Sequence, residues 1–325
     1  EFSISWIGKK DSLESTFSKS ESFHFISLDT KGFKGKNLFG KIVSLIYLEI
    51  NIIKSIFIIK KIKPDIVFST GGYVTLAPAL ASFILSIPLF IHEQNSIPGL
   101  VNRILNRFSK LSFEAFPGSF NKSPKIHTVG NPVRSEIIKN PECETAMKEH
   151  FNILILGGSQ GSKQLNEIVL KAFQDKIAPS HWRIVHQTGD LDKSTLVDVY
   201  SKQSFSYEVV SYIEDIGKAY HESDLVIGRS GAMTVSEICC SSKPSILFPL
   251  PWAADNHQYF NAKFLEDKKA SILLESTIDS ADKLFTLLND LEKDHNARHS
   301  MSLNAFDAFP VSSGNRIVEI INESF

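Results

Sequence analysis

The chain has few of the residues that would cross-link it or hold a metal. Among its 325 residues the only cysteines are Cys143, Cys239 and Cys240, and their spacing does not match a metal site. His257 has no second His, Cys or carboxylate four residues further along. We therefore expect a cytoplasmic protein with reduced thiols that needs no metal and no other cofactor.

The common nucleotide-binding motifs are also absent. No GxGxxG occurs in the chain, and Lys163 does not directly follow Gly161 as a P-loop requires. Basic and aromatic residues do not form a recognisable nucleic-acid-binding motif. The sequence therefore favours neither a dinucleotide-dependent enzyme nor a P-loop NTPase, and it predicts no nucleic-acid partner.

The longest apolar stretch, residues 42–62, is not continuous. Its interruptions are Glu49, Asn51, Lys54, Lys60 and Lys61. Because a membrane-spanning helix needs about 20 predominantly apolar residues, we expect a helix that does not span the membrane. No basic segment followed by an apolar run marks a signal peptide at the front.

Charge is divided unevenly along the chain. Residues 1–130 carry 16 Lys and Arg against 9 Asp and Glu, whereas residues 131–325 carry 19 against 27. The basic half points to an anionic partner. Because Lys31, Lys34, Lys36 and Lys41 precede the apolar stretch, we expect this region to contact an anionic membrane surface. An ordinary packed helix with solvated lysines is the alternative.

Short apolar runs alternate with turns and helical patterns. The runs occupy residues 65–68, 88–91, 152–156, 224–227 and 244–248, and three of them lead into glycine-rich turns. Strands alternating with helices indicate βαβ units and a parallel sheet. We therefore predict an α/β protein of two Rossmann-like, doubly wound domains that face each other across a cleft.

Turn residues and charges between residues 132 and 150 suggest the domain boundary. We place an N-terminal, membrane-side domain at residues 1–140 and a C-terminal domain at residues 141–325, and we expect the last helix to return to the N-terminal domain. Ligands of parallel sheets bind at the carboxyl ends of the strands. The turns at those ends are therefore the candidate site.

Two of these turns are suited to an anion. Gly157-Gly-Ser-Gln-Gly161 lies between a strand and a helix, where backbone N–H groups and the helix N-terminus favour a phosphate. Gly228-Arg-Ser-Gly231 leads into a second helix, which Ser230 or Thr234 is expected to cap. Glu237 would follow in the first turns of that helix. A tight turn, and a carboxylate that only complements the helix dipole, are the alternative interpretations.

Polar residues follow other strands of the predicted sheets. His92 and Asn95 follow one strand, and His92 fits a core histidine as well as a functional one. Arg134 follows another strand near the domain boundary, where a surface salt bridge is the alternative to a binding role. The helix after Pro249-Leu-Pro251 begins with the polar run Asp255-Asn-His-Gln258, which suits recognition of hydroxyls.

Six motifs, in order along the chain, resemble those of the bacterial MurG family of N-acetylglucosaminyltransferases. They are STGGYV at 69–74, HEQNSIPGLVNR at 92–103, GNPVR at 130–134, GGSQGS at 157–162, RSGAMTVSEI at 229–238 and ADNHQYFNA at 254–262. The resemblance implies a GT-B fold and an inverting transfer of GlcNAc from UDP-GlcNAc to the muramoyl 4-hydroxyl of lipid I. The product is lipid II, used in peptidoglycan synthesis and hence in cell-wall growth and division.

The resemblance also implies the partners and their places. UDP-GlcNAc would bind mainly the C-terminal domain, and lipid I, undecaprenyl-pyrophosphoryl-muramoyl-pentapeptide, would bind the N-terminal domain. The protein would lie peripherally on the anionic cytoplasmic face of the inner membrane.

Individual residues receive donor-binding roles from the same resemblance. Asn95, Arg134 and Ser159 match donor-binding positions, with Ser159 near the diphosphate, and the backbone of Ile213 matches the position that reads uracil. Gln258 matches the amide that binds the GlcNAc hydroxyls. The segment that matches the diphosphate and ribose site, with Glu237 on the ribose hydroxyls, comprises Ala232, Met233, Thr234, Val235, Ser236 and Glu237.

The front of the chain departs from the family pattern. The family begins with a strand and a GGTGGH-like loop that carries a candidate base, whereas this sequence begins at Glu1 with an alternating run over residues 2–7. We therefore expect a missing front piece and leave the catalytic base unassigned. Two alternatives remain at this point: a non-catalytic UDP-sugar-binding module, and another GT-B sugar-nucleotide enzyme such as an epimerase.

Overall fold

The chain forms two compact units. The computed structural model describes residues 3–30, 37–141, 149–158, 161–189, 193–277 and 279–325. Contacts divide the chain into a first unit of residues 1–94 and 98–128 and a second unit of residues 95–97 and 129–325. In both units, every strand pair among the described residues is parallel. The predicted α/β class of parallel sheets with alternating helices is confirmed.

The first unit contains two sheets. β1 (Ser5–Gly8) and β2 (His24–Ser27) form one, joined through α1 (Leu13–Ser20). The other has the order β3 (Val67–Ser69), β4 (Leu89–Glu93), β5 (Leu111–Glu114) and β6 (Ile126–Thr128). α3 (Tyr73–Ile84) and α4 (Leu100–Leu105) follow β3 and β4. Aliphatic side chains of these helices and strands form a shared core.

α2 (Leu38–Ile62), also in the first unit, packs a polar side inward against α3. Ser44, Asn51 and Ser55 are buried along this side, and the Asn51 amide donates to the Asp29 carbonyl at 2.7 Å. The opposite side is apolar and exposed. We call it the apolar face of α2, and it comprises Phe39, Ile42, Leu45, Ile46, Ile50, Ile53 and Phe57.

Residues 42–62 of α2 are long and apolar enough to cross a membrane by length and composition, the one such segment in the part of the chain that the structure describes. We expected the charged residues of this segment to make it too polar to span a membrane, and that expectation was wrong. Between residue 42 and Lys60 the only charged residues are Glu49 and Lys54. Its buried polar side nevertheless packs as part of the first unit.

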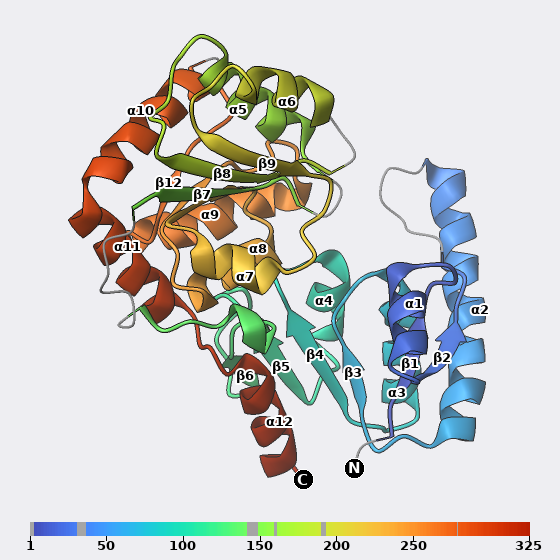
Figure 1. Ribbon diagram of the computed structural model, residues 1–325. Coiled ribbons are helices and arrows are strands. Elements are labelled where there is room, and N and C mark those ends of the chain that lie inside the picture. Colours follow the sequence, from blue (N-terminus) through green and yellow to red (C-terminus); the bar gives the residue numbers. More distant parts are fainter. Residues whose placement is uncertain (1–2, 31–36, 142–148, 159–160, 190–192, 278) are drawn as a thin grey trace. The chain divides into compact units, whose positions relative to one another are not determined.

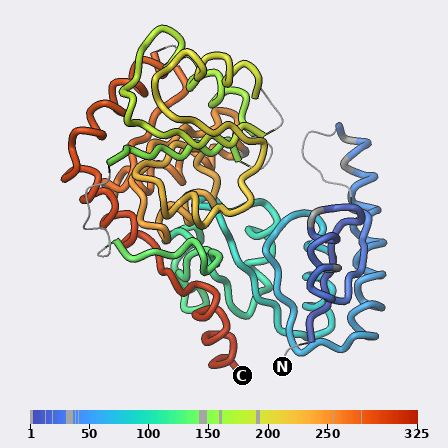
Figure 2. Tube along the Cα trace, viewed as in Figure 1, coloured from blue at the N-terminus to red at the C-terminus, as the bar shows by residue number. Residues whose placement is uncertain are grey.

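The second unit is a doubly wound domain around a six-stranded sheet. The strand order is β12 (Ser271–Leu273), β11 (Ser245–Leu247), β10 (Leu225–Gly228), β7 (Phe151–Leu156), β8 (Trp182–Gln187) and β9 (Ser206–Val210). The Cα trace in Figure 2 shows the chain passing from strand to helix to strand. The central strands occupy the apolar runs predicted from the sequence.

Helices cover both faces of this sheet. Figure 1 shows α5 (Lys163–Gln174), α6 (Lys193–Tyr200) and α10 (Ser280–Lys293) on one face. The other face carries α7 (Ile216–Glu222), α8 (Ala232–Cys240) and α9 (His257–Asp267). α11 (His295–Ala308) and α12 (Ser313–Glu323) complete the unit. One large hydrophobic core includes Trp182, Phe173 and Leu288.

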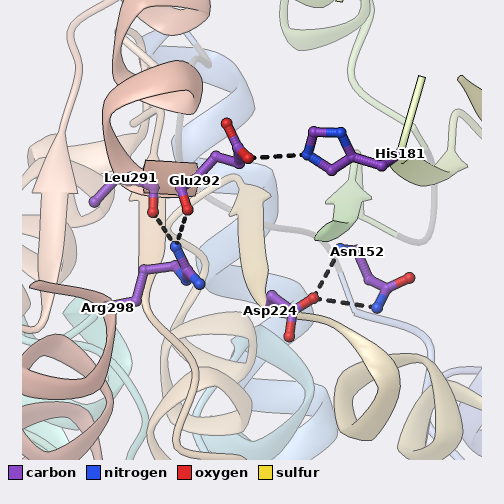
Figure 3. A network of polar contacts seen from close by, with 6 residues as sticks. All are labelled: Asn152, His181, Asp224, Leu291, Glu292 and Arg298. Atoms are coloured by element: carbon purple, nitrogen blue, oxygen red, sulfur yellow. Dashed lines mark hydrogen bonds and ion pairs between the residues drawn. The ribbon is translucent and has the colours of Figure 1, made fainter. Parts of the chain in front are cut away.

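Polar contacts join elements at the amino ends of β7 and β10 (Figure 3). The Asp224 carboxylate accepts from the backbone and the side chain of Asn152 at 2.8 and 3.1 Å. Arg298 donates to the carbonyls of Leu291 and Glu292, and the Glu292 carboxylate lies 2.9 Å from His181 Nε2. Since ligands bind at the carboxyl ends, we assign this network to stability.

Candidate functional site

The strand order of the second unit reverses between β7 and β10. The chain proceeds from β7 outward through β8 and β9 on one side, and through β10, β11 and β12 on the other. In such sheets the ligand crevice lies outside the carboxyl ends of the strands at this switch point. Both predicted glycine-rich turns, after Leu156 and after Ile227, lie at this point.

The turn after β7 requires its glycines. Gly158 and Gly161 have φ angles of 84° and 75°, which favour glycine. A Cβ on Gly157 would lie 2.9 Å from the Gln187 carbonyl oxygen, and one on Gly161 would overlap the Thr188 carbonyl. The close approach of backbone to backbone thus excludes a side chain at positions 157 and 161. Ser159 lies outside the described residues.

Gln187, at the end of β8, was not singled out by the sequence motifs. Its Nε2 donates to the Gly158 carbonyl at 3.0 Å, and its Oε1 accepts from the Ile213 backbone N–H at 3.0 Å. One buried amide therefore joins the turn predicted for the diphosphate to the residue predicted for uracil. Only the folded structure reveals this, because the partners lie 29 and 26 residues away.

Arg229 is a second buried group at the switch point. Its guanidinium donates to Ser162 Oγ at 2.7 Å, to Gln164 Oε1 at 2.9 Å and to the carbonyls of Phe248 and Pro249 at 3.1 and 3.3 Å. All of these acceptors are neutral, and burial lowers the pKa of Arg229 to about 10. A buried cation among neutral acceptors favours an anionic ligand nearby.

The start of α8 corrects the predicted cap. The N-cap is Gly231, which makes no side-chain capping hydrogen bond, so neither Ser230 nor Thr234 caps the helix. Ser230 Oγ instead donates to the Gln258 carbonyl at 2.7 Å. Backbone N–H groups of the first turn therefore have no side-chain cap, which suits an anion.

Residues of α8 point in different directions. Val235 and Ser236 are fully buried, so they can face a ligand only through the backbone of their helix, whereas Met233 is exposed. Ala232 and Thr234 are partly exposed. Ser236 Oγ accepts from Asn131 Nδ2 at 2.9 Å and donates to the Ala232 carbonyl.

Glu237 is partly buried on α8 and is held by Tyr220 of α7. The Tyr220 hydroxyl donates to Glu237 Oε2 at 3.1 Å. Burial raises the pKa of Glu237, while the Tyr220 hydrogen bond and the nearby positive charge of Arg134 lower it. Arg134 also lies 3.7 Å from the Glu136 carboxylate, and both side chains are about half exposed. Such an exposed pair contributes little stability.

The start of α9 is joined to two other segments. Gln258 Oε1 accepts from the Leu250 backbone N–H at 3.0 Å, which fixes the proline loop. Asn261 is fully buried, accepts from Ser96 Oγ at 2.7 Å, and donates to the Ser230 carbonyl at 3.1 Å. Asn95 Oδ1 lies 3.4 Å from Asn261 Nδ2. Asn95 and Gln258 are thus on segments that meet in the second unit.

The remaining candidates have structural surroundings. His92 is buried in the first unit, with Nδ1 3.2 Å from Gln94 Nε2 and its carbonyl accepting from Asn102. Cys239 and Cys240 are buried, and burial raises the pKa of both thiols. Among the described residues, no group of three or more His, Cys, Asp or Glu is placed to hold a metal ion.

Family models match both parts of the chain. Residues 1–113 match the glycosyltransferase family 28 N-terminal domain, and residues 152–317 match the glycosyltransferase family 28 C-terminal domain.

Individual relatives are similar over nearly the whole length. The UDP-N-acetylglucosamine–N-acetylmuramyl-(pentapeptide) pyrophosphoryl-undecaprenol N-acetylglucosamine transferase of Wigglesworthia glossinidia brevipalpis is 37% identical, over 98% of this chain and 88% of its own. The Coxiella burnetii (strain RSA 493 / Nine Mile phase I) protein of the same name is 35% identical, over 94% and 86%. The crystal structure of Acinetobacter baumannii MurG superimposes with a TM-score of 0.84 at 30% identity, over 98% of this chain and 91% of that one.

Proposed function

The chain belongs to glycosyltransferase family 28, and from that premise we propose how its residues use a sugar nucleotide. The fold is GT-B. The enzyme is an N-acetylglucosaminyltransferase that transfers GlcNAc from UDP-GlcNAc to lipid I and forms lipid II for peptidoglycan synthesis. The observation that carries this function is the similarity to MurG transferases along nearly the whole chain. It does not favour the epimerase or the non-catalytic binding module.

The diphosphate of the donor is proposed to bind at the switch point. The described part of the turn after β7 and the uncapped first turn of α8 from Ala232 supply N–H groups, and Ser159 is assigned to the same diphosphate by the resemblance alone. Their arrangement suits the negative oxygens of a diphosphate. Arg229 adds a buried positive charge that its neutral acceptors do not neutralise. We assign Met233, Thr234, Val235 and Ser236 to the same helical segment, with Val235 and Ser236 acting only through its backbone.

The nucleoside and the sugar are proposed to contact neighbouring segments. Glu237 would accept hydrogen bonds from the ribose hydroxyls, because an ionised carboxylate is an acceptor. The backbone of Ile213, held by Gln187, would read the uracil edge. Gln258 has its Oε1 directed at Leu250, so its Nε2 is the donor for GlcNAc oxygens. Asn95 and Arg134 complete the proposed set of donor-binding residues.

The chemistry is a displacement at the anomeric carbon of GlcNAc. The muramoyl 4-hydroxyl oxygen forms a bond to that carbon as the bond to the β-phosphate of UDP breaks, so an α-linked donor gives a β-linked product through an oxocarbenium-like transition state. The electron pair leaves with UDP. The hydroxyl proton passes to a base that we leave unassigned. N–H groups and Arg134 would stabilise the charge that develops on the diphosphate.

A peripheral position on the cytoplasmic membrane face is part of the proposal. The apolar face of α2 is exposed, and residues 1–130 carry an excess of basic over acidic residues. An apolar helical face beside basic residues suits the surface of an anionic bilayer. Lys31, Lys34 and Lys36 lie outside the described residues, as does the side chain of Lys41. We propose no nucleic-acid partner.

A transfer assay tests the function. Purified protein is incubated with radiolabelled UDP-GlcNAc, with and without lipid I in detergent. We expect label in lipid II and an equal amount of UDP, both only when lipid I is present. UDP-N-acetylmannosamine formed from the donor alone would identify an epimerase, and donor binding without any product would identify a binding module.

A further inference from the structure

Tyr220 lies on α7, outside all six sequence motifs, and directly contacts Glu237. Its side chain is fully buried, and its hydroxyl donates to Glu237 Oε2 at 3.1 Å. The partner is thus one oxygen of the carboxylate proposed for the ribose.

The two helices that bring these groups together are both held in place. Gly217, one turn before Tyr220 on α7, packs so closely against the 3-10 turn Ser135–Ile137 that a Cβ would lie 2.7 Å from the Glu136 carbonyl oxygen. On α8, Ser236, the residue before Glu237, is held by the Asn131 amide. The hydroxyl therefore meets the carboxylate in a fixed arrangement.

We propose that Tyr220 is a positioning residue for recognition of the donor ribose: its hydroxyl holds Glu237 Oε2 so that Oε1 faces the ribose hydroxyls. A carboxylate held through one oxygen presents the other in a defined direction. This proposal deepens the proposed function and rests on its assignment of Glu237 to the ribose.

Charge in this neighbourhood supports the same role. Glu237 must be ionised to accept two hydrogen bonds, yet burial raises its pKa. The Tyr220 hydroxyl and Arg134 oppose that rise, and the buried Cys240 thiol is the further titratable group coupled to Glu237. Loss of the Tyr220 hydroxyl therefore raises the pKa of Glu237, so ribose recognition is lost at a higher pH as the solution is acidified.

The test compares Tyr220→Phe with Tyr200→Phe in the full chain. Tyr200 is a matched control because it is also fully buried in the second unit, and its hydroxyl lies 3.0 Å from His186 Nδ1. Calorimetry measures the affinities of the parent and both variants for UDP, 2′-deoxy-UDP and 3′-deoxy-UDP between pH 5 and 8. Melting temperature reports on stability separately.

We expect the parent to prefer UDP over at least one deoxy analogue. In Tyr220→Phe, UDP affinity should fall about ten- to a hundredfold, the size expected for a lost hydrogen bond to a charged group. Affinity for that analogue, which keeps one of the two hydroxyls, should fall less, and the acid limb of UDP binding should move to higher pH. Tyr200→Phe should lower the melting temperature and keep the full preference.

Two results would overturn the role of Tyr220 alone: an undiminished preference for UDP in Tyr220→Phe, or an equal loss of affinity for UDP and both analogues. A parent that binds UDP with no preference over either analogue would instead overturn the assignment of Glu237 to the ribose, and the proposal with it. That result concerns the parent, so it is distinguishable from the first two.

Discussion

Gln187 holds two separate turns of the second unit with one side chain. Replacing it by methionine keeps most of its volume and removes both hydrogen bonds, to Gly158 and to Ile213. Because each bond contributes about 1 kcal/mol, we expect UDP affinity to fall by up to about thirtyfold as the two turns lose their spacing. Titration calorimetry with UDP measures this.

Gln203→Met is the control for that substitution. Gln203 also bridges backbone groups, with Ala178 donating to its Oε1 at 3.1 Å and its Nε2 donating to Phe173 at 2.8 Å. It precedes β9, away from the carboxyl ends of the strands. Gln203→Met should lower stability and leave UDP affinity unchanged. A similar drop in affinity in both variants would mean that Gln187 acts only through stability.

Glu237→Ala and Gln258→Ala should each weaken donor use, since each removes a polar partner of the nucleotide sugar. An unpaired buried polar group costs about 1–3 kcal/mol, so we expect kcat/KM for UDP-GlcNAc to fall roughly five- to a hundredfold. Cys239→Ser should leave it nearly unchanged, because Cys239 faces the core. Steady-state kinetics on the full chain measure all three, and equal losses would indicate general destabilisation.

The polar residues differ in how far the sequence could reveal them. Glu237 and Gln258 follow strands at positions that a pattern of turns and helices can suggest. Gln187 and Tyr220 look like ordinary residues of a strand and a helix, and their roles depend on partners 17 to 29 residues away. Only the packed sheet places those partners.

Among the larger elements, the central strands were predictable because each is a short apolar run ending in a turn. The side of α2 that is buried was not predictable, because the apolar residues of this helix outnumber the polar ones and form no clear stripe. Burial of Ser44, Asn51 and Ser55 depends on the contact with α3. The predicted N-cap of α8 was wrong for a related reason. The Ser230 hydroxyl bonds to the Gln258 carbonyl, a tertiary partner, instead of capping the helix.

The apolar face of α2 should bind vesicles. We expect the parent to sediment with anionic vesicles, partly in a salt-resistant manner because apolar side chains enter the bilayer. Ile46→Ser with Ile53→Ser should remove the salt-resistant fraction. Lys34→Glu, Lys36→Glu and Lys41→Glu should remove the salt-sensitive fraction, at about 1 kcal/mol for each basic residue.

Ile177→Ser is the matched control for vesicle binding, because Ile177 is an exposed isoleucine of the second unit, whereas α2 belongs to the first. It should sediment like the parent. Unchanged binding in both the isoleucine and the lysine variants, or equal binding to neutral and anionic vesicles, would place the membrane surface elsewhere.

For the chain as a whole, the second unit has its own core and carries most of the proposed donor site. We expect the fragment Val129–Phe325 to fold and to bind UDP, as measured by circular dichroism and calorimetry. The same fragment with Glu237→Ala should bind UDP more weakly. A folded fragment without uridine recognition would contradict the assignment of the donor to this unit.

Residues 95–97 belong to the second unit but are missing from this fragment, which should lower its stability. These residues group with the second unit although they lie between strands of the first. Ser96 donates two hydrogen bonds to the buried Asn261. The fragment lacks Ser96 and therefore both of these bonds. We therefore expect its melting temperature to be lower than the one measured for the second unit in the full chain.

The reversal of strand order in the six-stranded sheet also affects the kinetics of folding. β10 pairs with β7 in a register that joins Leu225 to Ile153, so the two turns of the donor site come from stretches about seventy residues apart. Contacts of such long sequence separation form slowly, because closing the intervening loop costs entropy first. Affinity for UDP should therefore return later in refolding than helical circular dichroism. The nucleotide would act as a ligand that traps the finished sheet, rather than as a template on which the sheet assembles.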